Sequence, residues 1–211
     1  MYQINIDGVA IVKTMFLASS NYSKIREISA IVENFGISLK SLLDLGLESP
    51  EESGKTFEEN ALLKARFGFE KTGLATIADD SGFCVKSLGG FPGIFSARFA
   101  EKNGGYHGAA KLLNELLKGE DKKSYFVTLV AFVGRNTSGR LEEHTFWGKV
   151  GGKFVYPPRG NNGFGYCPYF MPVGSNVTYG EIDNLQRAEN NQRSIALRKF
   201  ADFIGITEIA F

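Results

Sequence analysis

The sequence is poor in the residues that build zinc sites and disulfide-linked scaffolds. Its 211 residues include two cysteines, Cys84 and Cys167, and two histidines, His107 and His144. The cysteines lie far apart and show no metal-ligand spacing, so neither a structural zinc site nor a disulfide framework is expected. This cysteine usage favours a reducing compartment.

The chain also lacks a large charge excess and a long apolar run. Its formal net charge is +1. Because non-specific binding to nucleic acids or membrane surfaces needs a concentrated positive field, neither partner is expected. No segment approaches the roughly 18 apolar residues of a membrane span, and the N-terminal stretch has no basic region typical of a signal peptide. We therefore predict a cytoplasmic protein.

The length of the chain suits one large domain or two closely joined lobes. Helical spacing is expected after SSNYSK up to Gly36, from about Thr56 onward, at 107–118 and at 188–203. Strands are expected at 12–18, in SYFVTLVAFVG and in EEHTFWGKVGGKFVY, and a short strand and turn at 37–45. FCVKSLGG is expected to be a strand or hairpin, and FPGIFSARFA a rigid turn. Because helices alternate with strands, the fold class is α/β or α+β with a mixed sheet.

The segment ATIADDSG carries two adjacent carboxylates, Asp79 and Asp80, at the end of an apolar run that leads into a Ser-Gly turn. A buried carboxylate without a partner is costly, so positive groups are expected nearby. The candidates are Lys24, Lys64, Arg98, Arg159, Arg193 and a divalent cation. Such a set describes a site for a phosphate ester held through a hard metal ion. The alternative is that the two acids merely begin a turn.

A second candidate anion site is the loop SSNYSK, which lies between an expected strand and an expected helix. Ser19, Ser20 and Asn21 can donate to phosphate oxygens, and Lys24 adds a charge at the start of the helix. The alternative is an ordinary helix N-cap.

The acidic stretch before Thr56 contains two further carboxylates. Thr56 and Glu59 fit a capping box, which gives Glu59 a structural role. Glu51 and Glu52 lie in a flexible segment from which a carboxylate could reach a metal, or they are solvated loop acids. In the helix that follows, Asn60 and Lys64 are four residues apart and share a face.

The loop PPRGNNGFGYCPYFMP combines glycines with aromatic residues. Glycine lets the backbone approach a planar ligand, and a neighbouring ring can stack on a base. A covered turn that leads into a core strand is the alternative.

These segments, in this order, resemble the inosine triphosphate pyrophosphatase family, also called Ham1-like. The matching stretches include FLASSNYSKIREI, ESGKTFEENALLKA, NNQRSIALRKF and, most specifically, ADDSG followed by GGFPGIFSARFA. The resemblance begins near Met15, so residues 1–13 are an N-terminal extension or follow a misassigned start, and 14–211 form a single domain of two lobes. It implies an elongated fold with a long mixed sheet, a nucleotide cleft between the lobes and a homodimer.

The resemblance also implies hydrolysis of ITP, dITP and XTP to the monophosphate and pyrophosphate with Mg²⁺, which cleanses the nucleotide pool. Catalysis is assigned to Asp80 and Lys64, and the metal to Glu52 and Asp80. Triphosphate contacts are assigned to Ser19, Ser20, Asn21 and Lys24, a further substrate contact to Ser81, and the base to Phe164, Gly165, Tyr166, Cys167, Arg187, Gln192 and Arg193. Among these, Phe164–Tyr166 would stack on the base and Arg193 would contact its 6-oxo group.

Three departures from the family pattern lie on the side that recognises the base. Cys167 replaces the aspartate of FGYDP, Gln192 replaces the histidine of SHR, and Arg187 replaces a lysine. We therefore expect triphosphate hydrolysis to be retained and base discrimination to be altered. Two other functions stay open: hydrolysis of another modified nucleotide, and nucleotide sensing without turnover.

Overall fold

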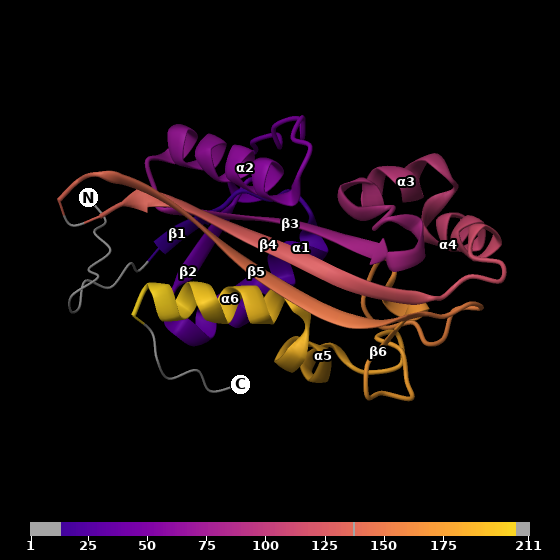
Figure 1. The fold of residues 1–211 in the computed structure, drawn as a ribbon. Helices are drawn as coiled ribbons and strands as arrows, with labels where there is room; N and C mark the ends of the chain where they lie inside the picture. Colours follow the sequence, from indigo (N-terminus) through magenta and orange to yellow (C-terminus); the bar gives the residue numbers. More distant parts are fainter. Residues whose placement is uncertain (1–13, 137, 206–211) are drawn as a thin grey trace. The chain divides into compact units, whose positions relative to one another are not determined.

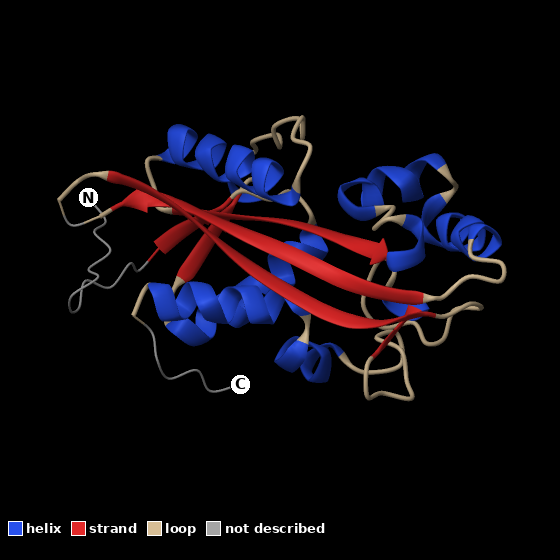
Figure 2. Cartoon of the chain, in the orientation of Figure 1, coloured by secondary structure: helices blue, strands red, loops and turns tan. Residues whose placement is uncertain are grey.

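The computed structural model describes residues 14–136 and 138–205. Within them, a six-stranded sheet has the order β2-β1-β3-β4-β5-β6. The strands are β1 (Thr14–Leu17), β2 (Ser38–Ser41), β3 (Thr76–Val85), β4 (Lys123–Arg135), β5 (Leu141–Phe154) and β6 (Phe170–Pro172), drawn in red in Figure 2. The helices are α1 (Tyr22–Val32), α2 (Phe57–Thr72), α3 (Ser96–Lys102), α4 (Gly105–Leu116), α5 (Asn184–Asn190) and α6 (Gln192–Phe203).

The sheet is mixed, as the sequence predicts. Strand β1 pairs in parallel with both β2 and β3, and Leu17 lies opposite Ile77. Strands β5 and β6 pair antiparallel, with Phe154 opposite Phe170. No helix in the described part of the chain is long and apolar enough to span a membrane.

The chain forms two compact units. Among the described residues, the first consists of residues 14–80, 128–136, 138–148 and 193–205, and the second of residues 81–127 and 149–192. Strands β3, β4 and β5 each contribute residues to both units. The described parts of the units are considered one at a time below.

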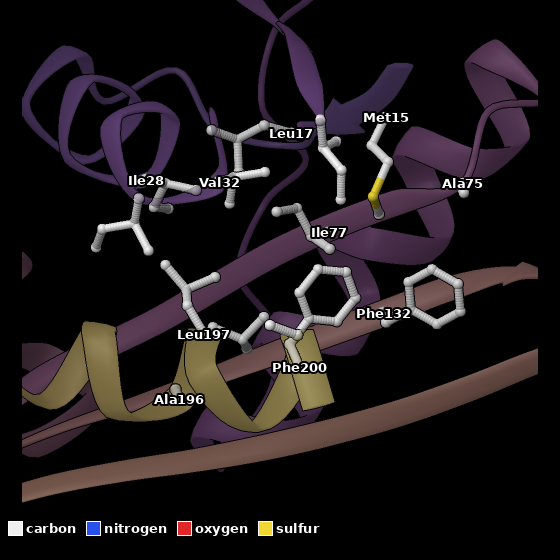
Figure 3. Packing of buried hydrophobic residues seen from close by; sticks show 14 residues of the cluster. Met15, Leu17, Ile28, Val32, Ala75, Ile77, Phe132, Ala196, Leu197 and Phe200 are labelled. Carbon is white, nitrogen blue, oxygen red and sulfur yellow. The ribbon is translucent and has the colours of Figure 1, made fainter. Parts of the chain in front are cut away.

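The first unit buries apolar residues on both faces of its strands. On one face, Leu17 and Ile77 pack in a cluster with Ile28 of α1 and with Leu197 and Phe200 of α6, as Figure 3 shows. A second cluster contains Phe16, Ala18, Ala78 and Leu129 together with Ala61 and Ala65 of α2. Helix α2 therefore lies on one side of these strands and α6 on the other (Figure 1).

The second unit has an aromatic core around Phe83 at the end of β3. The Phe83 ring lies 4.9 Å from the ring of Tyr166 and 5.3 Å from that of Phe126. Ala109 and Leu113 of α4 complete one side of this cluster. This core buries a large share of the aromatic side chains of the second unit.

Three sequence-based expectations are wrong in detail. The turn expected at Ser81–Gly82 is absent from the described chain: β3 runs from Thr76 to Val85, because Phe83 and Val85 are buried in the second core and burial overrides turn propensity. The segment FPGIFSARFA contains a 3₁₀ turn and helix α3 rather than a rigid turn alone. The helix expected at 188–203 is two helices, because Asn191 is extended at φ −82° and ψ 170°.

Other expectations are confirmed. The first helix passes through a 3₁₀ turn and stops at Gly36, whose φ of 72° is left-handed. Helix α2 begins after Thr56, and α4 covers most of the predicted 107–118 helix. The question raised for residues 1–13 lies outside the described residues.

Candidate active site

Asp79 and Asp80 are consecutive residues of β3 and are 2% and 4% exposed. Successive side chains of a strand point to opposite faces. Ile77 belongs to the cluster that includes α1 and α6, and Ala78 to the cluster that includes α2. Asp79 therefore faces α1 and α6, and Asp80 faces α2. Each acid has its own set of partners.

On the α2 side, Asp80 lies beside a buried lysine. The Nζ atom of Lys64 is 3.5 Å from Asp80 Oδ1 and 2.6 Å from Glu52 Oε1. Asn60, one helical turn before Lys64, donates from Nδ2 to Asp80 Oδ2 at 3.4 Å. One ammonium group thus holds two carboxylates from different segments of the chain.

The start of α2 fixes the loop that carries Glu52. Thr56 Oγ1 accepts from the backbone N–H of Glu59 at 3.1 Å, and Glu59 Oε2 accepts from the N–H of Lys55 at 2.6 Å. The predicted capping role of these two residues is confirmed, although Glu59 reaches Lys55 rather than Thr56. The buried Asn60 side chain also accepts from the N–H of Gly54 at 2.8 Å through Oδ1. Asn60 therefore links the Glu52 loop to Asp80.

On the opposite face, Asp79 is held by two cations. Its Oδ2 atom lies 3.1 Å from Lys24 Nζ and 3.2 Å from Arg193 Nη2. Arg193 also donates from Nη1 to Glu27 Oε2 at 2.6 Å, and its side chain is 2% exposed. Because α1 supplies Lys24 and Glu27 while α6 supplies Arg193, this network ties both helices to β3.

Burial and neighbouring charges shift the pKa values of three residues of the site, Asp80, Lys24 and Lys64. Burial raises the pKa of Asp80, and the positive charges of Lys64 and Lys24 offset this only in part. Burial lowers the pKa of Lys24, and the negative charge of Asp79 offsets part of that. For Lys64 burial again opposes the charge, but Asp80, Asp79 and Glu52 together outweigh it and raise the pKa. The pKa values of Lys64 and Asp80 are thus both raised, and perturbed pKa values of this kind are common at functional sites.

The loop before α1 shows the capping arrangement that the sequence left open. Asn21 is the N-cap, and its Oδ1 accepts from the N–H of Lys24 at 3.2 Å. Ser19 Oγ accepts from the N–H of Asn21 at 3.3 Å, and Ser20 is exposed. Capping does not exclude anion binding, because Asn21 Nδ2 and the serine hydroxyls are donors at a helix N-terminus.

The residues expected to recognise a base belong to the second unit, except Arg193. Tyr166 is 2% exposed and packs on Phe83, whereas Phe164 is half-buried and so presents more ring surface for stacking. Arg187 and Gln192 are also buried. Ser81 follows Asp80 directly in β3.

The structure brings together only part of the predicted cation set. Lys24, Lys64 and Arg193 contact the acid pair. Arg159 instead pairs with Glu181 at 3.0 Å, and the Arg98 guanidinium lies over the ring of Phe95 at 5.0 Å. Glu51 is an exposed loop residue.

Two residues of the site were missed from the sequence. Asn60 was recognised only as a neighbour of Lys64 on the helix, and that spacing was the available signal. Glu27 follows Lys24 by three residues on α1, but its partner Arg193 lies 166 positions further along the chain. Such a contact has no local sequence signal.

Among residues 14–136 and 138–205, no group of three histidine, cysteine or acidic side chains is arranged to hold a metal ion. Glu52 and Asp80 nevertheless converge on Lys64 from two segments. Two carboxylates fit Mg²⁺, which proteins usually bind through one or two carboxylates together with substrate phosphates and water.

Comparisons with known proteins agree with this chemistry. The chain is 39% identical over 186 residues to the dITP/XTP pyrophosphatase of Haemophilus influenzae, covering 86% of this chain and 93% of that protein. It is 39% identical over 194 residues to the dITP/XTP pyrophosphatase of Thermoanaerobacter pseudethanolicus, covering 90% and 96%. The structure of a HAM1 protein from Coxiella burnetii superposes with a TM-score of 0.81 at 30% identity, covering 92% of this chain and 99% of that one.

The family model described as the Ham1 family matches residues 15–203. This range includes both acids of β3, the α1 loop, the α2 lysine and the start of α6. The chain therefore belongs to the Ham1 family.

Proposed function

We propose that this protein hydrolyses dITP, ITP and XTP to the monophosphate and pyrophosphate and so removes deaminated purines from the nucleotide pool. The observation that carries the proposal is the ammonium group of Lys64, which lies between Glu52 and Asp80 in a chain of the Ham1 family. Relatives 39% identical to this chain are named dITP/XTP pyrophosphatases.

The residues of the first unit supply what phosphoryl transfer requires. A water molecule attacks a phosphorus atom, the bond to the pyrophosphate oxygen breaks, and the water loses a proton. Asp80 accepts that proton, which its raised pKa favours. Lys24 and Lys64 offset the negative charge of the phosphates, and the donors of Ser19, Ser20 and Asn21 orient their oxygens.

Hydrolases of this kind generally need a divalent cation, and we propose Mg²⁺. Glu52 and Asp80 would hold it, because their carboxylates already converge on Lys64 Nζ. The ion would supply charge neutralisation at the phosphates and a water of lowered pKa. Lys64 would then hold both carboxylates in place.

The base is proposed to contact the segment from Phe164 to Cys167 and the residues Arg187, Gln192 and Arg193, and Ser81 is proposed as a further substrate contact. Phe164 would stack on the purine, because Tyr166 is already packed against Phe83. A guanidinium group donates to the 6-oxo group of hypoxanthine or xanthine and finds no acceptor at the 6-amino group of adenine.

We also propose that the protein works as a cytoplasmic homodimer. The proposal follows from the family resemblance and from the cysteine usage of the chain. Light scattering after gel filtration would give the mass of the particle, and a monomer at micromolar concentration would contradict the homodimer.

The test is a pyrophosphate-release assay with ITP, dITP, XTP, dGTP and dATP, with Mg²⁺ and with a chelator. Release from the deaminated nucleotides that stops with the chelator is expected. Tight binding without release would instead identify a nucleotide sensor. The variant Asp80→Asn should abolish pyrophosphate release. Release that persists in this variant would come from a contaminating phosphatase.

A further inference from the structure

Two buried arginines of this chain differ in how their charge is compensated. Arg193 donates to two carboxylates, Asp79 and Glu27. Arg187 is 7% exposed, and its Nη1 atom is buried without a hydrogen-bond partner among the described residues. The guanidinium of Arg193 therefore has its hydrogen-bond acceptors within the protein, whereas Nη1 of Arg187 can donate to a bound ligand.

Arg187 Nη1 lies close to Gly163 and Cys167. A Cβ atom built on Gly163 would lie 2.5 Å from Arg187 Nη1 and 2.8 Å from Cys167 Sγ, so both groups lie against Gly163. Gly163 has a φ of 75°, and the absence of a side chain there leaves room for the guanidinium. All three residues belong to the second unit, and Arg187 and Cys167 are among the residues proposed to contact the base.

Gln192, also in the second unit, carries another unused polar atom. It is 8% exposed, and its Oε1 atom is buried without a partner in the described part of the chain. A carbonyl oxygen accepts from an N–H group. Hypoxanthine and xanthine both offer such a group at N1, whereas the N1 atom of adenine is an acceptor. Gln192 can therefore exclude adenine but does not distinguish the two deaminated bases.

A buried cation without a counter-charge is costly, and a negatively charged ligand relieves that cost. The xanthine base of XTP loses a proton slightly below neutral pH and carries a negative charge at physiological pH. Hypoxanthine is neutral under the same conditions. The negative charge of xanthine therefore suits the guanidinium of Arg187, whose Nη1 atom has no hydrogen-bond partner among the described residues.

We propose that the guanidinium of Arg187 contacts the base and makes the site favour XTP over ITP. The inference rests on the proposed function. It states which base the altered site prefers, namely xanthine. It attributes this preference to Arg187, whose hydrogen-bond partner would be the bound base.

The test measures kcat/KM for XTP and for ITP in the same preparation and compares their ratio among variants. In Arg187→Gln, which keeps a donor but removes the charge, the ratio of XTP to ITP should fall about tenfold. In Cys167→Asp, a carboxylate next to the guanidinium should lower the ratio by a similar factor. The matched replacement Cys167→Ser changes the same atom without adding charge and should move the ratio much less.

Arg140→Gln, which removes an exposed guanidinium outside the site, controls for a general loss of positive charge. An unchanged ratio in Arg187→Gln, or equal effects of serine and aspartate at position 167, would overturn the inference. In that case turnover of ITP and XTP would still support the proposed function.

If no nucleotide is turned over, the proposed function fails, but base preference can still be measured. Calorimetric titration with XMP and IMP then gives the ratio of their dissociation constants in the same variants. Tighter binding of XMP that is lost in Arg187→Gln would support the inference, and equal binding of both would contradict it.

Discussion

The ammonium group of Lys64 lies 2.6 Å from Glu52 Oε1. The same group is 3.5 Å from Asp80 Oδ1, so one positive charge lies beside two carboxylates and opposes the effect of burial on the pKa of Asp80. Replacing Lys64 by glutamine removes that charge and leaves Asp80 beside Glu52, and both burial and Glu52 raise the pKa of Asp80.

The acid limb of the kcat/KM profile should therefore move to higher pH in Lys64→Gln. Asp80 must be ionised to accept a proton, and its pKa, already raised by burial, loses the opposing effect of Lys64. Pyrophosphate release measured at a series of pH values checks this. Lys71→Gln, an exposed position on the same helix, is the control and should leave the limb in place. A limb at the wild-type pH in Lys64→Gln would show that Asp80 is not the titrating group.

Asp80→Asn should abolish turnover without destabilising the fold at neutral pH. Loss of the proton acceptor should lower kcat by about 100-fold or more. Because the folded pKa of Asp80 is raised, ionisation in the folded state costs stability once the pH exceeds the ordinary aspartate pKa, and asparagine avoids that cost. Thermal melts at neutral pH should show a Tm equal to or above that of the wild type. The advantage should fade as the pH falls below the ordinary value, and a large drop in Tm at neutral pH would contradict this account.

Arg193→Met should destabilise the protein strongly. The substitution leaves the buried Asp79 without one of its cations and Glu27 without its 2.6 Å partner. Losing one member of a buried ion-pair network typically costs about 3 kcal/mol or more of unfolding free energy. Urea titration followed by circular dichroism measures the change. Arg26→Met, at an exposed position of α1, is the matched control and should change the unfolding free energy by less than about 0.5 kcal/mol.

Gly54→Ala should weaken catalysis through the Glu52 loop. A Cβ atom at this position would lie 2.5 Å from Asn60 Oδ1 and 2.9 Å from the backbone nitrogen of Asn60, so the loop has to shift. A shift of the carboxylate by an ångström should lower kcat/KM by about tenfold or more. The neighbouring Ser53→Ala is exposed and should behave like the wild type. A fully active Gly54→Ala would mean that the position of Glu52 is not critical.

Much of the fold follows from local signals in the sequence. The capping residues Asn21 and Thr56 predict the starts of α1 and α2, and Gly36 predicts the end of the first helical segment. The predictions fail where contacts with residues distant in the sequence determine the local structure. Burial of Phe83 keeps Ser81 and Gly82 in strand β3. Asn191 is extended and separates two helices in a region where the spacing of apolar residues predicts one helix.

The candidate site shows the same division between local and distant signals. Lys64 and Asp80 could be predicted because an acid pair at the end of an apolar run requires a cation, and the helix lysine was a candidate. The ion pairs of Arg193 with Glu27 and Asp79 could not be predicted, because they join three segments that only tertiary packing brings together. Whether the base residues meet one substrate stays a prediction that the kinetic experiments address.

Because Asp79 and Asp80 point to opposite faces of β3, the position of each acid along the strand decides which helices it contacts. The pairing of Leu17 with Ile77 fixes the register of β3 against β1. The number of residues between Ile77 and each acid then decides which helices that acid contacts. Deleting Ala78 would turn both carboxylates over and present each to the helices that now serve the other. The apolar residues of this strand can therefore be exchanged for others of similar size, whereas its length between Ile77 and Asp80 cannot change by even one residue without exchanging the two charge networks.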